Sequence, residues 1–150
     1  MGLGKDALQV AITQIGNSEN PLGSNWGTPV KDYLKTVGIN FPAPWCMAFI
    51  YWCFEQSKKT APNPLVKTGG VLAAWNTADK KYRVVDEVQV GDIFIMDYGK
   101  GLGHTGIVEK VTETFVYTIE GNTNDVGSRE GTIVSRKKRS KKKIKGYLRY

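Results

Sequence analysis

Apolar residues in the first half of the chain recur three or four positions apart, which is the spacing of the buried face of a helix. This pattern predicts a helix over residues 6–15, which Gly16 would end. A second helix is predicted over residues 29–36, opened by a proline, and a third over 46–57, after an extended proline-rich segment. A short fourth helix is predicted over residues 71–77.

From residue 82 onward the pattern changes to short β-branched and aromatic runs divided by turns, which is typical of strands. The predicted strands cover residues 83–85, 92–97, 105–111, 115–119, 132–136 and 144–149. Helices followed by strands favour an α+β domain, in which helices pack against one face of an antiparallel sheet. We therefore predict one domain over residues 1–150, with a basic hairpin at residues 131–150.

The composition agrees with a single globular domain. A chain of 150 residues can bury roughly two thirds of its unfolded surface, and no apolar run approaches the ~20 residues of a membrane span. The hydrophobic fraction of 41% is a globular value. The first residues lack the basic stretch and long apolar core of a secretory signal, so we predict none.

The net charge of +7 is concentrated near the C-terminal end of the sequence. Removing the nine basic residues beyond Ser135 from the total of 21 leaves 12, against 14 acidic residues. The nine are Arg136, Lys137, Lys138, Arg139, Lys141, Lys142, Lys143, Lys145 and Arg149. Such a local excess would attract an anionic polymer, such as a wall polymer or nucleic acid, or would be a solvated hairpin tip.

The residues with the clearest chemistry are a cysteine and the one histidine. Cys46 begins the third predicted helix, where free backbone N–H groups and the helix dipole favour a thiolate. His104 is the one imidazole of the chain, so it is the base that a nucleophilic thiol would need. Glu120 and Asn122 offer a carboxylate and an amide, either of which could hold the second ring nitrogen.

Neither a disulfide nor a metal site is expected. Cys46 and Cys53 lie seven positions apart on one predicted helix, about 10 Å along its axis, which is too far for a disulfide. We expect Cys53 to pack as a small apolar residue. One histidine with two helical cysteines does not make a normal zinc site, and residues 17–28 contain a single carboxylate, Glu19, which is too few for calcium. We predict no metal and no cofactor.

The order Cys46, His104, Glu120 resembles that of the CHAP family of cysteine- and histidine-dependent amidohydrolases and peptidases. The resemblance spans most of the chain. It includes Gly91-Asp92-Ile93-Phe94-Ile95, which is similar to the strand before the family's histidine hairpin, and Gly121-Asn122-Thr123-Asn124 after the third catalytic position. The residues that flank the cysteine depart from the pattern of many members.

The resemblance implies a papain-like layout in which Cys46 is the nucleophile, His104 the base and Glu120 the acid that orients the ring. Asn122 would be a helper or a substitute for Glu120. The implied chemistry is amide hydrolysis through an acyl-enzyme, with the Cys46 N–H as the first oxyanion donor. The departure lies at Trp45, where many members carry a small or polar residue, and at Met47-Ala48, where many carry Thr-Trp, and it points to a sub-branch of the family.

The resemblance also implies bacterial peptidoglycan as the substrate, cut by an N-acetylmuramoyl-L-alanine amidase or an endopeptidase. We predict that Trp45, Trp26 and Tyr98 line the substrate groove. A monomer is expected, made in a bacterial or phage-infected cytoplasm and delivered to the cell wall or periplasm as a phage lysin, prophage enzyme or secreted effector. An effector would also imply an immunity protein. An acyltransferase and a nonenzymatic binder of anionic polymers are the alternatives.

Overall fold

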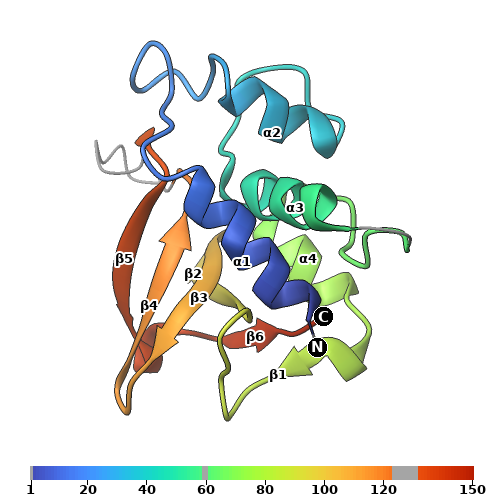
Figure 1. Ribbon diagram of the computed structural model, residues 1–150, viewed down its shortest axis with the longest axis vertical. Coiled ribbons are helices and arrows are strands. Elements are labelled where there is room, and N and C mark those ends of the chain that lie inside the picture. The colour runs from blue at the N-terminus through green and yellow to red at the C-terminus, as the bar shows by residue number, and fades with distance from the viewer. Residues whose placement is uncertain (1, 59–60, 123–131) are drawn as a thin grey trace.

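The computed structural model describes residues 2–58, 61–122 and 132–150, and the statements below refer to these residues. Within them the chain forms four α-helices followed by the strands of a sheet (Figure 1). The helices are α1 (Leu3–Thr13), α2 (Val30–Thr36), α3 (Cys46–Ser57) and α4 (Val71–Thr77). The strands are β1 (Arg83–Val84), β2 (Ile93–Gly99), β3 (Leu102–Val111), β4 (Phe115–Glu120), β5 (Ser135–Ser140) and β6 (Gly146–Leu148).

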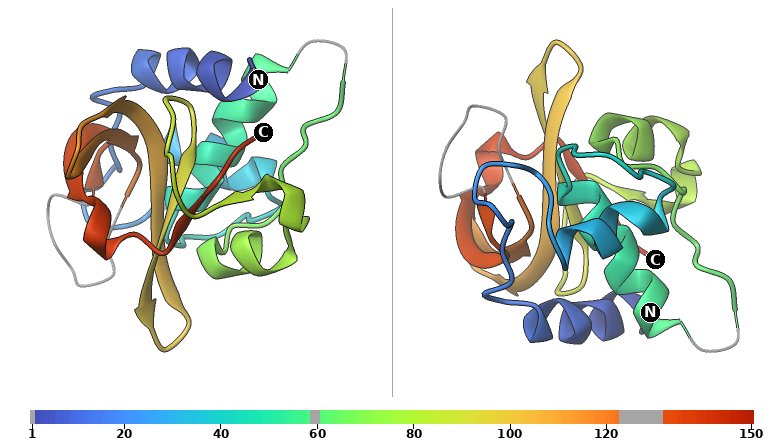
Figure 2. Two further views of the ribbon diagram at one scale, coloured as in Figure 1. Left: turned by 90° about the horizontal axis from the view of Figure 1, so that it is seen from below. Right: turned by 90° about the horizontal axis from the view of Figure 1, so that it is seen from above.

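The strands form one antiparallel sheet in the order β1-β6-β2-β3-β4-β5. Helices α1, α3 and α4 contact β3, whereas α2 packs on α3 farther from the sheet. The sheet is strongly curved when seen from below or above the view of Figure 1 (Figure 2). No helix in the described part of the chain is long and apolar enough to cross a membrane. The helices and sheet confirm the predicted α+β class.

Two hydrophobic clusters occupy the two faces of the curved sheet. On β2, Ile93 and Ile95 belong to the main core that includes the helices, while Phe94 and Met96 belong to a smaller cluster. This alternation follows from the period of two along a strand. The smaller cluster also contains Val108, Val116 and Tyr147. Because both faces of the central strands are buried, the residues that they carry have little freedom to move.

The sequence placed most elements correctly but shifted three of them, one of which is β5, which begins at Ser135, three residues after the predicted start. Helix α1 begins at Leu3, three residues before the predicted start, where Gly4 lies against the backbone of Gly91. A side-chain carbon at Gly4 would lie 2.5 Å from the carbonyl oxygen of Gly91, so a glycine is needed there. Strand β3 begins at Leu102, and the Gly-rich segment before it is the predicted hairpin turn, with Lys100 and Gly101 at positive φ.

The predicted basic hairpin at residues 131–150 is wrong, and its first residue lies outside the described part of the chain. Strand β5 pairs with β4 at one edge of the sheet, while β6 lies between β1 and β2. Strand β5 covers Ser135–Ser140, so four of the nine basic residues lie on an edge strand. Charged side chains are tolerated there because an edge strand has one side open to solvent.

Candidate active site

Cys46 is the first residue of α3, as the sequence predicted. The carbonyl of Trp45, the residue before it, accepts the N–H of Phe49 at 2.9 Å and starts the helix. The Cys46 N–H donates no hydrogen bond to any described residue, which is normal for the first turn of a helix. Cys46 keeps 6% of its surface exposed, so a free N–H and a thiol lie together at a nearly buried helix start.

His104 lies within β3 opposite Met96 and is 1% exposed. Its ring packs edge-on against Phe94, with the ring centroids 5.8 Å apart. The ring nitrogen Nε2 donates to Oε1 of Glu120 at 2.7 Å. The other nitrogen, Nδ1, is buried and forms no hydrogen bond within the described residues. Nδ1 is therefore the nitrogen left for the thiol of Cys46.

The surroundings of His104 favour its protonated form. Burial of the ring is the largest single effect and lowers the pKa, but it is outweighed by Cys46 and then by Glu120. The net result raises the pKa of His104 from 6.5 to about 9. For Cys46 to raise the pKa of His104, its sulfur must lie close to the ring. The sulfur and Nδ1 do not meet hydrogen-bond geometry, since Nδ1 has no hydrogen-bond partner among the described residues. The structure thus brings Cys46, His104 and Glu120 together from α3, β3 and β4.

The carboxylate of Glu120 accepts four hydrogen bonds in a site where the residue is 1% exposed. Oε1 accepts from His104 at 2.7 Å and from Nη2 of Arg139 at 2.6 Å. Oε2 accepts from Nε of Arg139 at 2.8 Å and from the hydroxyl of Thr118 at 2.7 Å. A carboxylate has about four acceptor positions, so Glu120 is saturated.

This bonding keeps Glu120 ionised. Burial is the largest effect and raises the pKa, but Arg139 and then His104 oppose it and lower the pKa of Glu120 from 4.5 to about 2. An ionised carboxylate is an acceptor only, so Nε2 of His104 carries a hydrogen. Glu120 therefore fixes the tautomer of the ring and does not itself carry a proton at neutral pH.

Two glycines allow this packing. A side-chain carbon at Gly106 would lie 2.6 Å from Cγ of Glu120 and 2.7 Å from the ring of Phe94. At Gly121 it would lie 2.7 Å from the indole of Trp45, which covers the backbone just after Glu120. Real side-chain carbons do not approach this closely. Gly106 is therefore needed for Glu120 to reach its observed place, and Gly121 for Trp45 to pack against the backbone after it.

Asn122 does not hydrogen-bond the ring of His104, since Nε2 is held by Glu120 and Nδ1 has no hydrogen-bond partner among the described residues. Its amide donates to Glu19 at 3.0 Å and to the side-chain oxygen of Asn25 at 3.1 Å. Glu19, which is 2% exposed, also accepts the indole N–H of Trp45 at 2.8 Å. Of the two predicted partners for the ring, the structure places Glu120 on Nε2, and Asn122 instead ties residues 17–28 to the start of α3. Thr123 and Asn124, which follow it, lie outside the described residues.

The three predicted groove aromatics have different surroundings. Trp45 is completely buried and stacks on Tyr33 with the centroids 5.6 Å apart, so the prediction that it lines the groove is wrong. Trp26 is partly buried, with the ammonium group of Lys31 5.5 Å from its ring centroid. Tyr98 is 49% exposed and close enough to Arg139 to act on its charge, so a substrate contact there stays a prediction.

Cys53 is fully buried, and burial raises its pKa well above the ordinary value. This confirms the prediction that it packs in the core. Both cysteines are free, as the predicted helical spacing requires. Within the described ranges, no three His, Cys, Asp or Glu residues lie together as a metal site would need.

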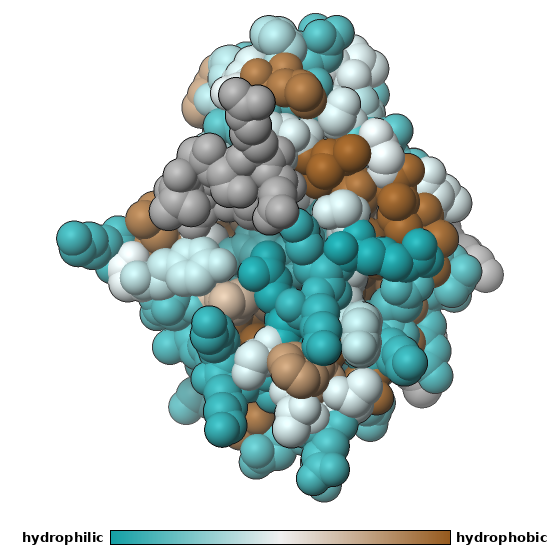
Figure 3. All heavy atoms as spheres, turned by 90° about the vertical axis from the view of Figure 1, so that its left-hand side faces the viewer, coloured by the Kyte–Doolittle hydropathy of each residue, from teal (hydrophilic) through white to brown (hydrophobic). Residues whose placement is uncertain are grey.

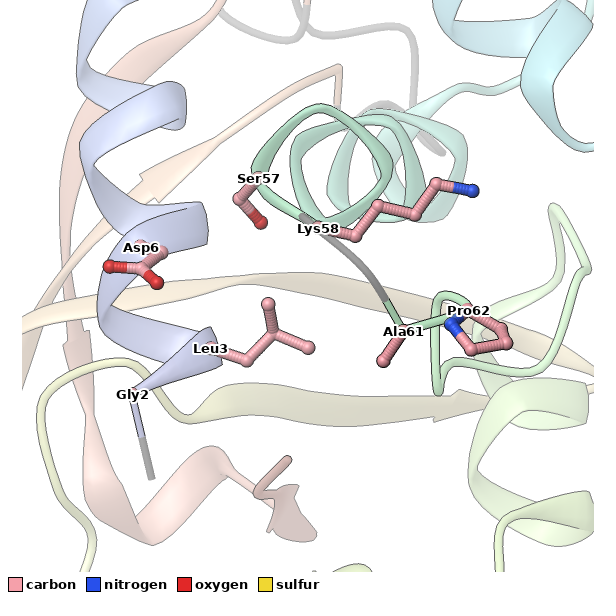
Figure 4. A pocket seen from close by; sticks show the side chains of 7 residues that line it. All are labelled: Gly2, Leu3, Asp6, Ser57, Lys58, Ala61 and Pro62. Carbon is pink, nitrogen blue, oxygen red and sulfur yellow. The ribbon is translucent and has the colours of Figure 1, made fainter.

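A pocket of about 300 Å³ lies between the start of α1 and the end of α3, lined by Leu3, Asp6 and Lys58 among others (Figure 4). Helix α3 has Cys46 at its other end, roughly 16 Å away along the axis at 1.5 Å per residue. The pocket is lined by none of the three residues of the catalytic group. It is therefore separate from the candidate active site.

The sequence did not single out Thr118, Glu19 or Arg139. Thr118 lies two residues before Glu120, so both side chains share a face of β4, and this signal was present. Arg139 sits among similar basic residues, and only the pairing of β5 with β4 shows which of them reaches Glu120. Glu19 was the one carboxylate of its loop, but nothing in the sequence indicated the distant donors that it binds.

Comparison with known proteins agrees with this geometry. The CHAP domain matches residues 38–122, more than half of the chain, and this range includes Cys46, His104 and Glu120. No curated protein matches. One similar solved structure, "The crystal structure of Ly7917", has a TM-score of 0.58 and 15% sequence identity, covering 97% of this chain and 62% of that one. The chain spans less than two thirds of that protein. These matches confirm the predicted papain-like α+β fold.

Proposed function

The chain belongs to the CHAP domain family of peptidoglycan amidases and peptidases, and from this premise we propose that it hydrolyses an amide bond of peptidoglycan through Cys46. The observation that carries the proposal is the arrangement around His104, whose Nε2 is held by Glu120 while Nδ1 is left for the thiol. This is the arrangement that a thiol nucleophile with an oriented base requires.

In the first half of the reaction, His104 takes the proton of the Cys46 thiol at Nδ1, the ring nitrogen that has no partner among the described residues. The sulfur of Cys46 attacks the scissile carbonyl carbon and forms a C–S bond. The N–H of Cys46, which has no other described acceptor, stabilises the oxyanion. As the C–N bond breaks, the imidazolium gives its proton to the leaving amine.

In the second half, the neutral imidazole of His104 takes a proton from water, and the resulting hydroxide attacks the thioester carbon. The C–S bond breaks, the free carboxylic acid leaves, and the imidazolium returns its proton to the sulfur of Cys46. Glu120 keeps the ring aimed throughout, since its four hydrogen bonds leave it no freedom to turn.

The test is digestion of purified peptidoglycan by the wild-type protein and by Cys46→Ala, followed by mass spectrometry. Wild type should release fragments with new amine termini, and Cys46→Ala should release none. Equal digestion by the two proteins would reject the mechanism. His104→Ala should also be inactive while keeping the circular dichroism spectrum of a folded protein.

The same digestion identifies the bond. A free N-terminal L-alanine would show an N-acetylmuramoyl-L-alanine amidase, and a free amine within the stem or cross-bridge peptides would show an endopeptidase. An added amine that becomes linked to the new acyl end would show a transferase, which shares the first half of the reaction. We propose that the domain acts at the cell wall after delivery from the cytoplasm where it is made.

A second role is favoured by the charge on the face of β5, which is mostly hydrophilic in Figure 3. Lys138, Lys142 and Lys143 are exposed and form no ion pair with a described acid. The basic residues between and beyond these lysines are less available than their charge suggested. Four of them pair with acids elsewhere, in the pairs Arg136–Glu109, Arg139–Glu120, Lys145–Asp97 and Arg149–Asp92.

We therefore propose that these exposed lysines hold the domain on an anionic wall polymer, with the nonenzymatic binder as the limiting case. Retention on purified walls should weaken steeply with salt and persist in Cys46→Ala. Replacing Lys138, Lys142 and Lys143 by Gln should reduce the retention and its salt dependence. Retention of this triple variant at the wild-type level would exclude the surface.

A further inference from the structure

Arg139 on β5 is joined to the candidate active site by two hydrogen bonds. Its Nε donates to Oε2 of Glu120 at 2.8 Å, and its Nη2 donates to Oε1 at 2.6 Å. The side chain of Arg139 is 23% exposed, whereas that of Glu120 is 1% exposed. The guanidinium thus closes the outer side of the site and holds both carboxylate oxygens at once, which fixes the plane of the carboxylate.

A second arginine on the same strand makes a similar pair without reaching the site. Arg136 donates from Nε and Nη2 to the two oxygens of Glu109 at 2.9 and 3.0 Å. Its side chain is 56% exposed and that of Glu109 is 23% exposed. Solvent screens a pair of this kind, so it contributes little. Arg136 therefore offers a matched control for the loss of a positive charge and of a forked ion pair from β5.

We propose that Arg139 is a positioning residue of the active site, which acts through Glu120 to aim Oε1 at His104 and to limit how tightly the imidazolium holds its proton. The inference rests on the proposed function, because it gives Arg139 a part in the same reaction. Oε1 is shared between Arg139 and His104, so the arginine takes up part of the negative charge that would otherwise act on the ring.

The charges around His104 determine the sign of the effect. The groups that face the site are the thiol of Cys46 from α3, Glu120 from β4 and Arg139 from β5, with the phenol of Tyr98 on β2 beside Arg139. Removing the positive charge of Arg139 should favour the imidazolium and raise the pKa of His104. Removing the negative charge of Glu120 should lower it. Removing Arg139 and removing Glu120, the two members of one ion pair, should therefore shift the pKa of His104 in opposite directions.

The experiment compares Arg139→Met, Arg139→Lys and Arg136→Met. The ring resonances of the single histidine are followed by NMR as a function of pH, and kcat and KM are measured on soluble peptidoglycan fragments. In Arg139→Met the pKa of His104 should rise above the wild-type value, and kcat should fall about 100-fold at little change in KM, as expected for a displaced catalytic group. Arg136→Met should match wild type in both measurements.

Arg139→Lys separates charge from geometry, because lysine keeps the positive charge but cannot form the two-point fork. It should leave the pKa of His104 near the wild-type value and still lower kcat by at least about tenfold. It also carries the test if Arg139→Met fails to fold. Wild-type kcat in Arg139→Lys, or an Arg139→Met variant that matches Arg136→Met, would overturn the proposal.

A purely structural role for Arg139 would give a different result. If its loss only loosened the site, the pKa of His104 would fall toward 6.5 in Arg139→Met, as in Glu120→Gln, and this too would overturn the proposal. The NMR measurement uses no substrate. Failure of the peptidoglycan assay in the wild-type protein would reject the proposed function, while the titration would still decide how Arg139 acts on His104.

Discussion

The substitution Glu120→Gln tests the electrostatics on which the site depends. The rise of the pKa of His104 from 6.5 to about 9 corresponds to about 3 kcal/mol in favour of the imidazolium. This is a net value, since burial of the ring acts in the opposite direction. Gln keeps the shape of the side chain and an oxygen acceptor but removes the charge, and it leaves the charge of Arg139 without its partner.

Both consequences lower the pKa of His104, while the larger raising effect of Cys46 remains in the variant. We therefore expect the pKa to fall by at least about 1 pH unit, within the range known for a close opposite charge. The assay is a pH titration of the imidazole carbon-bound protons by NMR. His104 is the one histidine of the chain, so its signals need no assignment.

The matched control is Glu109→Gln, which removes the carboxylate of the exposed pair with Arg136 on the same sheet. It should leave the titration of His104 unchanged. The reasoning would be refuted by a wild-type pKa near 6.5, or by Glu120→Gln and Glu109→Gln variants that titrate alike.

Three further outcomes follow from the same contacts. A thiol alkylating reagent should label Cys46 faster than Cys53, because Cys53 is fully buried and has a raised pKa. Mass spectrometry at early time points measures the two labelling rates, and faster labelling of Cys53 would mean that Cys46 is not the nucleophile. Gly106→Ala should displace Glu120 and lower kcat by at least about tenfold, whereas Gly70→Ala, with no contact under 3.4 Å, should not. Finally, the raised pKa of His104 contributes fully to the free energy of unfolding below pH 6.5, and about 3 kcal/mol of this free energy should be lost as the pH rises to about 9. Urea unfolding at a series of pH values should show this loss in the wild-type protein and not in His104→Gln.

The sequence predicted the helices of the site well because their signals are local. Helix α3 covers Cys46–Ser57 as predicted, since the prolines before it and the apolar run within it both act over a few residues. Helix α4, Val71–Thr77, was predicted at the same residues. The position of Cys46 at a helix start therefore required no knowledge of the rest of the fold.

The sheet was harder because strand pairing is not local. The basic residues of β5 have low strand propensity, and the strand forms because β4 supplies its hydrogen-bond partners. The role of Arg139 depends on this pairing, and so could not be predicted from its neighbours in the sequence. The same holds for Glu19, whose donors Trp45 and Asn122 lie 26 and 103 positions away.

The aromatic residues near the nucleophile illustrate a different limit. Trp45 was expected to line the substrate groove, yet it is fully buried between Tyr33 and Phe49, and its N–H is satisfied by Glu19. A tryptophan contributes more by filling a core than by facing solvent when a buried acceptor is available. The sequence gave no sign of that acceptor.

The order of strands in the sheet determines when the sheet can be completed during synthesis on the ribosome. Strand β6 lies between β1 and β2, although it is made after all the other strands. During translation, β2 therefore lacks one of its two described neighbours, and β1 lacks the one strand that it pairs with among the described residues, until Leu148 has left the exit tunnel. The sheet that carries His104 cannot be completed before then, so the nascent chain should acquire its reactive thiol only after synthesis has passed this point.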